Sequence, residues 1–355
     1  MGKVGYITIH NTINFGSQLQ TLALYKAIES LGIDVELIDY TAAAIKQRES
    51  TLPLKEAKTA KDIVKSLLLH KNLEARKQNF QRTLRKNVRC SREYSRDNIN
   101  EANKEYDTFL VGSDIVWGLN ITGDDFTYML DFASPEKKKL SFSSSVGTKW
   151  DENKATQVRE LLSRFDSISV REHDAADWIS ELTGKKVNVT CDPTMLWNEK
   201  FWKEFVGNAV VSKEKYVLVY MSDPENKCIR SAIEYGKAHK MPVYYINYRA
   251  PVMGTKDCRP TSLETWLQLF QNAEVVFSAS YHGLLFSLYF HKQFFYFNWT
   301  NKSRMNALSK TLGIEKREGL PENVQKDIPI DYSLLDQNMK EMRENSWNVL
   351  REMLL

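Results

Sequence analysis

Residues 278–283, Ser-Ala-Ser-Tyr-His-Gly, place a histidine between an apolar run typical of a strand and the apolar helical run LLFSLYF. Ser280 can cap that helix, whose first N–H groups and partial positive charge suit an anion. His282, expected in the first turn, could supply a proton or a hydrogen bond, and Gly283 would let a ligand approach the backbone. The alternative is a histidine that only packs or bonds a carbonyl. The segment is a candidate anion site.

Other polar residues follow directly after apolar runs. Residues 11–17 contain Asn14 and Gly16, residues 112–117 contain Ser113 and Asp114, residues 191–194 contain Asp192, and Arg171 follows the run 167–170. Carboxylates can orient or deprotonate a hydroxyl, and arginine can bind a carboxylate or phosphate through two parallel hydrogen bonds. Each feature also has a structural interpretation, because Asn, Gly, Ser and Asp are common in turns and surface arginines often pair with neighbours. These residues are therefore candidates, with turn or surface roles as the alternative.

The usual cofactor and nucleophile motifs are absent from the sequence. It contains no G-x-G-x-x-G, Walker A, H-E-x-x-H or G-x-S-x-G motif. The four cysteines, Cys90, Cys191, Cys228 and Cys258, are scattered, with neither a C-x-x-C pair nor a zinc-finger spacing. We therefore expect no cofactor, no resident metal and no nucleic-acid partner.

Apolar strand-like runs alternate with helical segments along most of the chain, which is typical of parallel sheets built from βαβ units. The pattern predicts strands at 3–9, 34–40, 107–111, 138–144, 167–170, 187–190, 216–220, 242–246, 274–277 and 293–297. Ser17-x-x-Gln20 matches a capping box and predicts that a helix begins there and runs to about Leu31. Ligands of such sheets bind beyond the carboxyl ends of the strands, which is where the candidate loops fall.

The strand–helix pattern restarts after about residue 200, which predicts two domains. We expect an α/β protein with two doubly wound, parallel-sheet (Rossmann-like) domains facing a cleft, at 1–200 and 201–330. Residues 331–355 form one long amphipathic pattern, and we expect that helix to pack back on a domain surface.

Charge is distributed unevenly over a chain whose net charge is only +4. Residues 46–96 contain 15 Lys or Arg against 5 Asp or Glu, and 54–88 reads as one or two amphipathic helices. The segment is either a solvated surface or a patch that meets anionic lipid head groups or a phosphorylated acceptor. The start, MGKVGYITIH, reads as a strand and not as a signal peptide. We expect a cytoplasmic protein, with peripheral contact at the inner face of the membrane as the sharper alternative.

Taken together and in order, these motifs resemble the polysaccharide pyruvyl transferase family. The similar segments are NTINFGSQLQTLALYKAIESLGIDVELIDY, YDTFLVGSDIVW, DSISVREHDAADWISELTG with VTCDPTML, VVFSASYHGLLFSLYFHKQFFYF, and Arg304 with Leu312-Gly313. They run from about residue 4 to 315. Each motif is modest, but five in sequence are hard to obtain by chance.

The resemblance implies a GT-B-like fold and transfer of a pyruvyl unit from phosphoenolpyruvate to two hydroxyls of one sugar, with a lipid-linked sugar among the candidate acceptors. It implies an acceptor side in the N-terminal domain and a donor side in the C-terminal domain. His282 would bind phosphate and move protons, and Asp114 or Asp192 would act on the acceptor hydroxyl. The residues expected to bind the substrates are Asn14, Gly16, Ser113, Arg171, Ser280, Gly283 and Arg304.

Two other functions are consistent with the same sequence. The first is a GT-B-type glycosyltransferase that uses a nucleotide-sugar. The second is a catalytically silent family member that only binds a sugar or an anion. Fold similarity alone does not choose among the three.

Overall fold

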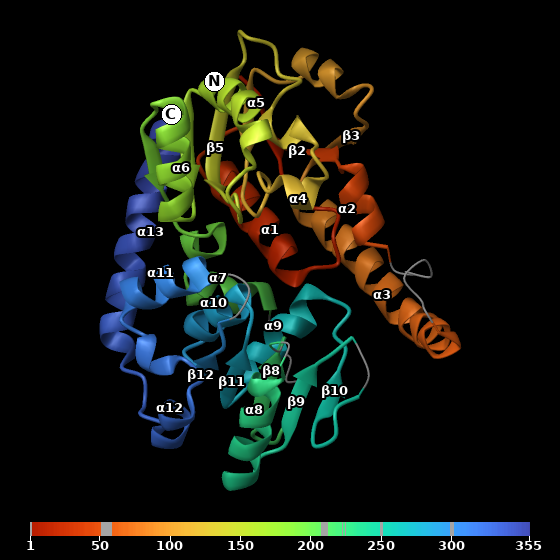
Figure 1. Cartoon of the computed structure of the whole chain (residues 1–355), viewed down its shortest axis with the longest axis vertical. Coiled ribbons are helices and arrows are strands. Elements are labelled where there is room, and N and C mark those ends of the chain that lie inside the picture. The colour runs from red at the N-terminus through yellow and green to blue at the C-terminus, as the bar shows by residue number, and fades with distance from the viewer. Residues whose placement is uncertain are drawn as a thin grey trace. The chain divides into compact units, whose positions relative to one another are not determined.

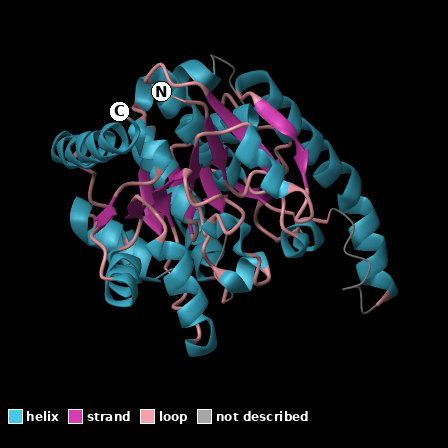
Figure 2. Cartoon of the chain, turned by 90° about the horizontal axis from the view of Figure 1, so that it is seen from above, coloured by secondary structure: helices cyan, strands magenta, loops and turns pink. Residues whose placement is uncertain are grey.

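The computed structural model describes residues 2–50, 59–206, 212–221, 223, 225–248, 251–298 and 302–355 (Figure 1). These residues fall into two compact units. Unit 1 comprises Met1–Ala57, Lys77–Leu196 and Glu341–Leu355, and unit 2 comprises Lys58–Arg76 and Trp197–Lys340. Figure 2 shows strands flanked by helices, which is the layered arrangement of α/β proteins.

Unit 1 contains a seven-stranded sheet in the order β3-β2-β1-β4-β5-β6-β7. Its strands, all paired in parallel, are β1 (Val4–Ile7), β2 (Val35–Tyr40), β3 (Cys90–Tyr94), β4 (Thr108–Val111), β5 (Lys138–Ser144), β6 (Ser167–Val170) and β7 (Val187–Val189). The helices are α1 (Phe15–Ser30), α2 (Ala43–Arg48), α4 (Leu119–Thr122), α5 (Glu152–Ser163) and α6 (His173–Thr183), with 3₁₀ helices η2 (Ile99–Lys104), η3 (Phe126–Met129) and η4 (Pro193–Leu196).

The central strands of unit 1 are apolar on both faces because helices cover both sides of a doubly wound sheet. All residues of β1 and β4 are buried, and Ile7, Phe109 and Val111 join one hydrophobic core with residues of α5 and α6. The chain order reverses between β1 and β4, so this is the switch point at which parallel sheets of this kind bind ligands.

Unit 2 contains a five-stranded parallel sheet in the order β10-β9-β8-β11-β12 and has a hydrophobic core of its own. Its strands are β8 (Val217–Tyr220), β9 (Val243–Ile246), β10 (Lys256–Cys258), β11 (Val275–Ser278) and β12 (Gln293–Tyr296). The helices are α7 (Glu199–Val206), α8 (Lys227–Ala238), α9 (Leu263–Asn272), α10 (Tyr281–Tyr289), α11 (Lys302–Leu312) and α12 (Pro321–Lys326), with η5 (Glu315–Arg317). The expectation of an α/β protein with two doubly wound parallel sheets is confirmed.

The predicted capping box at the start of α1 is wrong. The helix begins at Phe15, and its N-cap is Asn14, whose side-chain oxygen accepts hydrogen bonds from the N–H groups of Gly16 (2.9 Å) and Ser17 (3.3 Å). The Gln20 amide donates to the Ser17 carbonyl inside the helix, so it does not reach back to an N-cap. The Ser-x-x-Gln pattern was misleading because both side chains form hydrogen bonds with the loop after β4, Ser17 with Asp114 and Gln20 with Ser113.

Two long helices belong partly to each unit. Helix α3 (Ala60–Asn87) belongs to unit 2 up to Arg76 and to unit 1 from Lys77. Helix α13 (Tyr332–Leu354) belongs to unit 2 up to Lys340 and to unit 1 from Glu341. Residues 54–58 of the predicted basic helix lie outside the described residues. No helix in the described part of the chain is both long and apolar enough to cross a membrane.

Candidate functional site

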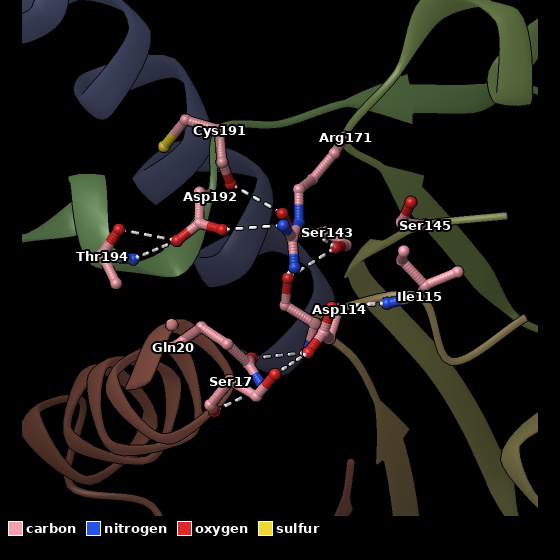
Figure 3. A network of polar contacts seen from close by, with 12 residues as sticks. Ser17, Gln20, Asp114, Ile115, Ser143, Ser145, Arg171, Cys191, Asp192 and Thr194 are labelled. Carbon is pink, nitrogen blue, oxygen red and sulfur yellow. Dashed lines mark hydrogen bonds and ion pairs between the residues drawn. The ribbon is translucent and has the colours of Figure 1, made fainter. Parts of the chain in front are cut away.

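A buried ion pair joins the ends of two neighbouring strands of unit 1. Arg171 directly follows β6, and Asp192 follows β7 by way of Thr190 and Cys191. The Arg171 Nη1 atom lies 2.9 Å from the Asp192 Oδ2 atom, and the two side chains are only 1% and 0% exposed (Figure 3). The other carboxylate oxygen of Asp192 accepts hydrogen bonds from the Thr194 N–H (2.9 Å) and hydroxyl (2.6 Å). The pair therefore fixes the two loops relative to each other.

Ser113 carries this network to the end of β4. Its hydroxyl accepts from Arg171 Nε (2.8 Å) and donates to the Ser143 carbonyl (2.8 Å). Its backbone N–H donates to the Gln20 side chain of α1 (3.2 Å), and its carbonyl accepts from Thr8, which follows β1 (3.0 Å). Ser113 thus connects both strands of the switch point, and it is fully buried.

Asp114 is the partly exposed carboxylate of the network. It accepts hydrogen bonds from the Ser17 hydroxyl on α1 and from the Ile115 N–H (2.8 Å), as Figure 3 shows. Its φ of 75° is unusual for a residue with a side chain, and Ser143 has a φ of 56°. Non-glycine residues held in such sparsely populated conformations cluster at functional sites. The backbone geometry agrees with the choice of Asp114 as a candidate.

Gly112 explains how these chain segments approach so closely. Its φ is 128°, and a β-carbon added there would lie 2.1 Å from the Phe142 carbonyl oxygen of β5. Only glycine fits this position, and it places Ser113 and Asp114 beside the loop that follows β5. Ser145 in that loop donates a hydrogen bond to the buried Glu172 carboxylate, which adds a second buried acid near Arg171.

The predicted anion site of unit 2 forms a tight turn between β11 and α10. Ser280 is the N-cap of α10 and accepts a hydrogen bond from the Gly283 N–H (3.4 Å), while the Ser278 hydroxyl donates to the Tyr220 carbonyl (2.8 Å). The helix begins at Tyr281, and His282 is half-buried in its first turn, where the sequence placed it. A β-carbon added to Gly283 would lie 2.1 Å from Ser278 Oγ. Gly283 is therefore needed for packing inside the turn.

A histidine that the sequence reading did not select lies after β1. The Nδ1 and Nε2 atoms of His10 lie 3.2 Å from the Thr8 carbonyl and 3.1 Å from an Asp39 carboxylate oxygen. Because both partners accept hydrogen bonds, both ring nitrogens can donate at once only in the protonated ring. The hydrogen bond from His10 lowers the pKa of Asp39.

Burial disfavours ionisation of the four cysteine thiols. Burial raises the pKa of the Cys191 thiol to about 12 and those of Cys90 and Cys258 to about 11, and it raises the pKa of Cys228 as well. A thiol attacks as the thiolate, so none of the four is activated at neutral pH.

Comparison with protein families gives one match. The family model described as polysaccharide pyruvyl transferase matches residues 14–301, which is most of the chain. The chain belongs to this family. The matched range begins at the N-cap Asn14 and includes the Arg171–Asp192 pair and His282.

Solved structures with a similar fold are glycosyltransferases and epimerases of the GT-B type. A UDP-GlcNAc 2-epimerase from Neisseria meningitidis bound to UDP-GlcNAc has a TM-score of 0.54 at 11% identity, covering 99% of this chain and 98% of that chain. A putative UDP-N-acetylglucosamine 2-epimerase from Listeria monocytogenes has a TM-score of 0.54 at 13% identity, and the match covers 96% of this chain and 90% of that chain. An alpha-glucosyltransferase in complex with UDP has a TM-score of 0.50 at 9% identity, and the match covers 98% of this chain and 96% of that chain. At such low identities the likeness shows the fold alone. No curated protein sequence gives a significant match.

The site residues predicted from the sequence fall into two groups in the structure, one in each unit. The structure brings Ser113, Asp114, Arg171 and Asp192 into one network in unit 1, with Asn14 and Gly16 at the start of α1, and it brings Ser280, His282 and Gly283 together in unit 2. The Arg304 side chain lies outside the described residues, and the family match ends before it. Sequence reasoning missed Ser17, Gln20, Ser143 and Glu172. Ser17 and Gln20 already stood out in the presumed capping box.

Two hollows of unit 2 lie apart from the predicted residues. One, of about 390 Å³, lies between α11, α12 and the start of α13, and another, of about 200 Å³, is lined by Asp223, Asn298 and Gly319 among others. Neither is lined by His282 or Ser280. Among the described residues, no group of three or more His, Cys, Asp or Glu side chains is placed to hold a metal ion.

Proposed function

We propose that the protein transfers the pyruvyl unit of phosphoenolpyruvate to two hydroxyls of one sugar in a glycan or lipid-linked glycan precursor, in the cytoplasm. The observation that carries this proposal is the family match across residues 14–301. In the reaction, the bond between carbon 2 and the phosphate oxygen breaks, and two sugar oxygens bond to carbon 2 to form a ketal. One hydroxyl proton ends on carbon 3, which becomes a methyl group, and the other ends on the phosphate.

Unit 2 would bind the donor. The first N–H groups of α10 and the imidazole of His282 offer hydrogen bonds to a phosphate or carboxylate, and the helix N-terminus favours negative charge. Arg304 is the proposed further cation. His282 is also the proposed proton carrier, because imidazole changes charge near neutral pH and carries a donor and an acceptor nitrogen.

Unit 1 would act on the acceptor sugar. Asp114 is the carboxylate best suited to orient or deprotonate a hydroxyl, since it is partly exposed and held by Ser17. Arg171 and Asp192 were expected to contact the substrates, but their side chains are 1% and 0% exposed. We assign them instead the role of holding the loops after β4, β6 and β7 in place.

The test is incubation of the protein with phosphoenolpyruvate and candidate sugars, lipid-linked sugars included, followed by mass spectrometry of the sugar and measurement of released phosphate. His282→Ala should lower the rate roughly 10²–10⁴-fold, as expected for loss of an acid–base group. The melting temperature should stay near that of the wild type, since the cap Ser280 is intact.

His291→Ala is the matched control, because His291 is a partly exposed histidine of the same unit that pairs with Asp336. It should leave the rate unchanged. Normal turnover by folded His282→Ala protein would reject the assigned role. Transfer from a UDP-sugar in place of phosphoenolpyruvate would instead select the glycosyltransferase, the reaction class of the UDP-bound alpha-glucosyltransferase with a similar fold.

A further inference from the structure

The larger hollow of unit 2 has the size of a small-molecule site. Its volume is about 390 Å³, and the described residues that line it all fall between Leu312 and Leu335, within unit 2. Sites for small ligands commonly have volumes of about 300–1,000 Å³. Neither Ser280 nor His282 lines this hollow, so it is a different place from the proposed donor site.

Much of the wall of the hollow is apolar. Leu312, Ile314 and Leu335 are at most 4% exposed, whereas Ile328 and Leu334 are 54% and 61% exposed. Single exposed aliphatic side chains are ordinary on a protein surface, but these two border the same hollow as three buried ones. The five side chains together suit a ligand with an apolar body.

Three basic residues line the same hollow, against one described acid. Lys316 and Lys326 are exposed, and in the part of the chain that the structure describes neither forms a salt bridge. The acid, Asp331, already has partners, because its carboxylate accepts hydrogen bonds from the N–H (2.9 Å) and the hydroxyl (2.5 Å) of Ser333. The hollow therefore offers positive charge to an anionic group.

The third basic residue, Arg317, is a buried cation with one donor nitrogen left over. Its side chain is 7% exposed, and Nε and Nη1 donate to the carbonyls of Phe294 (2.9 Å) and Ile328 (2.7 Å). Among the described residues Nη2 has no hydrogen-bond partner, and the Asp327 carboxylate lies 3.8 Å from it. Burial lowers the pKa of Arg317, so the charged form is disfavoured where it lies. A negative charge in the hollow would offset this, since a buried charge is screened much less than an exposed one.

We propose that this hollow binds a small amphipathic anion, a carboxylate or phosphate monoester that carries an aliphatic body. The body packs against the apolar wall, and the head group lies beside Lys316 and Lys326, within the field of Arg317. A neutral aliphatic ligand would leave the three cations without a counter-charge, and a small ion would leave the apolar wall in water. The inference does not depend on the proposed reaction, because it concerns other residues of unit 2.

The test is isothermal titration calorimetry of the full-length protein with octanoate, octyl phosphate, octanol and acetate. We expect one molecule of either eight-carbon anion per chain, and the tighter of the two identifies the preferred head group. Octanol should bind roughly tenfold more weakly than octanoate, because it keeps the aliphatic body but has no charge to pair with the lysines. Acetate should bind roughly a hundredfold more weakly or less, since it lacks most of the methylene groups that the wall would bury.

Variants of the lining residues separate the two contributions. Lys316→Gln with Lys326→Gln should weaken octanoate binding roughly tenfold and leave octanol binding unchanged. Leu334→Glu changes an exposed position and should weaken both ligands, the anion more, because it shortens the apolar wall and adds a like charge. The matched control is Lys237→Gln with Lys310→Gln, which removes two exposed lysines of the same unit that do not line the hollow. It should bind octanoate as the wild type does.

The inference would be overturned if neither anion bound, if octanol bound as tightly as octanoate, or if several octanoate molecules bound per chain. An equal loss of affinity in the two lysine double variants would also overturn it. So would a wild-type dimer in light scattering that Leu334→Glu converts to a monomer, because the apolar wall would then cover a second copy of the chain. His282→Ala should bind octanoate normally whatever its transfer activity, so a failed binding test and a failed reaction are separate results.

Discussion

The Arg171–Asp192 pair shows how a buried charge is made tolerable in this protein. Removing two ions from water costs several kcal/mol each, and their mutual attraction offsets this only when the remaining polar atoms are also bonded. Thr194 satisfies the second oxygen of Asp192, and Ser113 accepts from Arg171 Nε. The net contribution to stability is therefore small, and the benefit is a single arrangement of the loops after β4, β6 and β7.

Breaking the pair from one side should be far worse than replacing it. Asp192→Ala leaves the Arg171 charge buried without its partner, so we expect a loss of roughly 3–5 kcal/mol in the free energy of unfolding. Urea unfolding followed by circular dichroism measures this loss. The double variant Arg171→Met, Asp192→Leu should recover much of it, because no charge then remains buried. If the single variant unfolded at the wild-type urea concentration, the pair would not have the burial described here.

The His10–Asp39 contact predicts a dependence of stability on acid. The hydrogen bond from His10 lowers the pKa of Asp39, so the folded state binds a proton at this carboxylate less readily than the unfolded chain does. The stabilisation is present above the unfolded pKa of about 3.9 and is lost as the pH falls through the lower folded value.

Melting temperatures measured from neutral pH down to about pH 3 should therefore fall less steeply for Asp39→Asn than for the wild type. Asp34→Asn is the comparison variant, because Asp34 is an exposed carboxylate that pairs with the exposed Arg89. Parallel curves for the wild type and Asp39→Asn would contradict the assignment of the pKa shift to this contact.

At the scale of elements, the start of α1 depends on one side chain. Asn14 accepts hydrogen bonds from two of the first N–H groups of a helix that is buried along most of its length. Asn14→Ala should lower stability by about 0.5–2 kcal/mol, the usual effect of removing an N-cap. Thermal unfolding measures this, and Asn14→Asp should retain most of the wild-type stability because it keeps the acceptor. Ser17, the N-cap expected from the sequence, instead donates its hydroxyl to Asp114.

The buried strands could be located from the sequence alone. Strands such as β4 and β8 are continuous apolar runs, because a central parallel strand is covered on both faces, and they were located to within a residue or two. Two edge strands, β3 (CSREY) and β10 (KDC), were not predicted, whereas the more apolar edge strands β7 and β12 were. An edge strand is paired on one side only and partly solvated, so its residues need not be apolar and carry no periodic signal.

The candidate site was only partly predictable for a related reason. Loops after strands could be located, since their place follows from the strand pattern, and this gave Ser113, Asp114, Arg171 and Asp192. Which side chain bonds which depends on tertiary distances between segments up to about a hundred residues apart, as in the contact between Ser17 and Asp114. Local sequence therefore indicated a capping box where the folded protein has a cross-link between α1 and the loop after β4.

At the scale of the whole molecule, neither unit is a continuous stretch of chain. Unit 2 takes up residues 58–76 and unit 1 takes up residues 341–355, so two of the divisions fall inside α3 and α13. The sequence pattern predicted a change of domain near residue 200 and a final helix that packs back on a domain surface. It predicted no division inside α3 or α13, because periodicity describes a helix but not the partner against which each end packs. The last turns of α13 pack on unit 1, where Ser346 accepts from the Cys191 N–H (2.9 Å) and the Arg343 and Trp347 side chains donate to the carbonyls of Met195 and Leu196.

These contacts have a consequence for biosynthesis. A ribosome makes the chain from the N-terminus, and domains generally fold in the order in which they emerge. Here the core residues Leu350, Met353 and Leu354 and the partner of the Cys191 N–H are translated after all of unit 2. The segment that holds Asp192 consequently waits, with its final partners missing, until the last turns of α13 have been synthesised. The N-terminal unit begins to form first but is completed last.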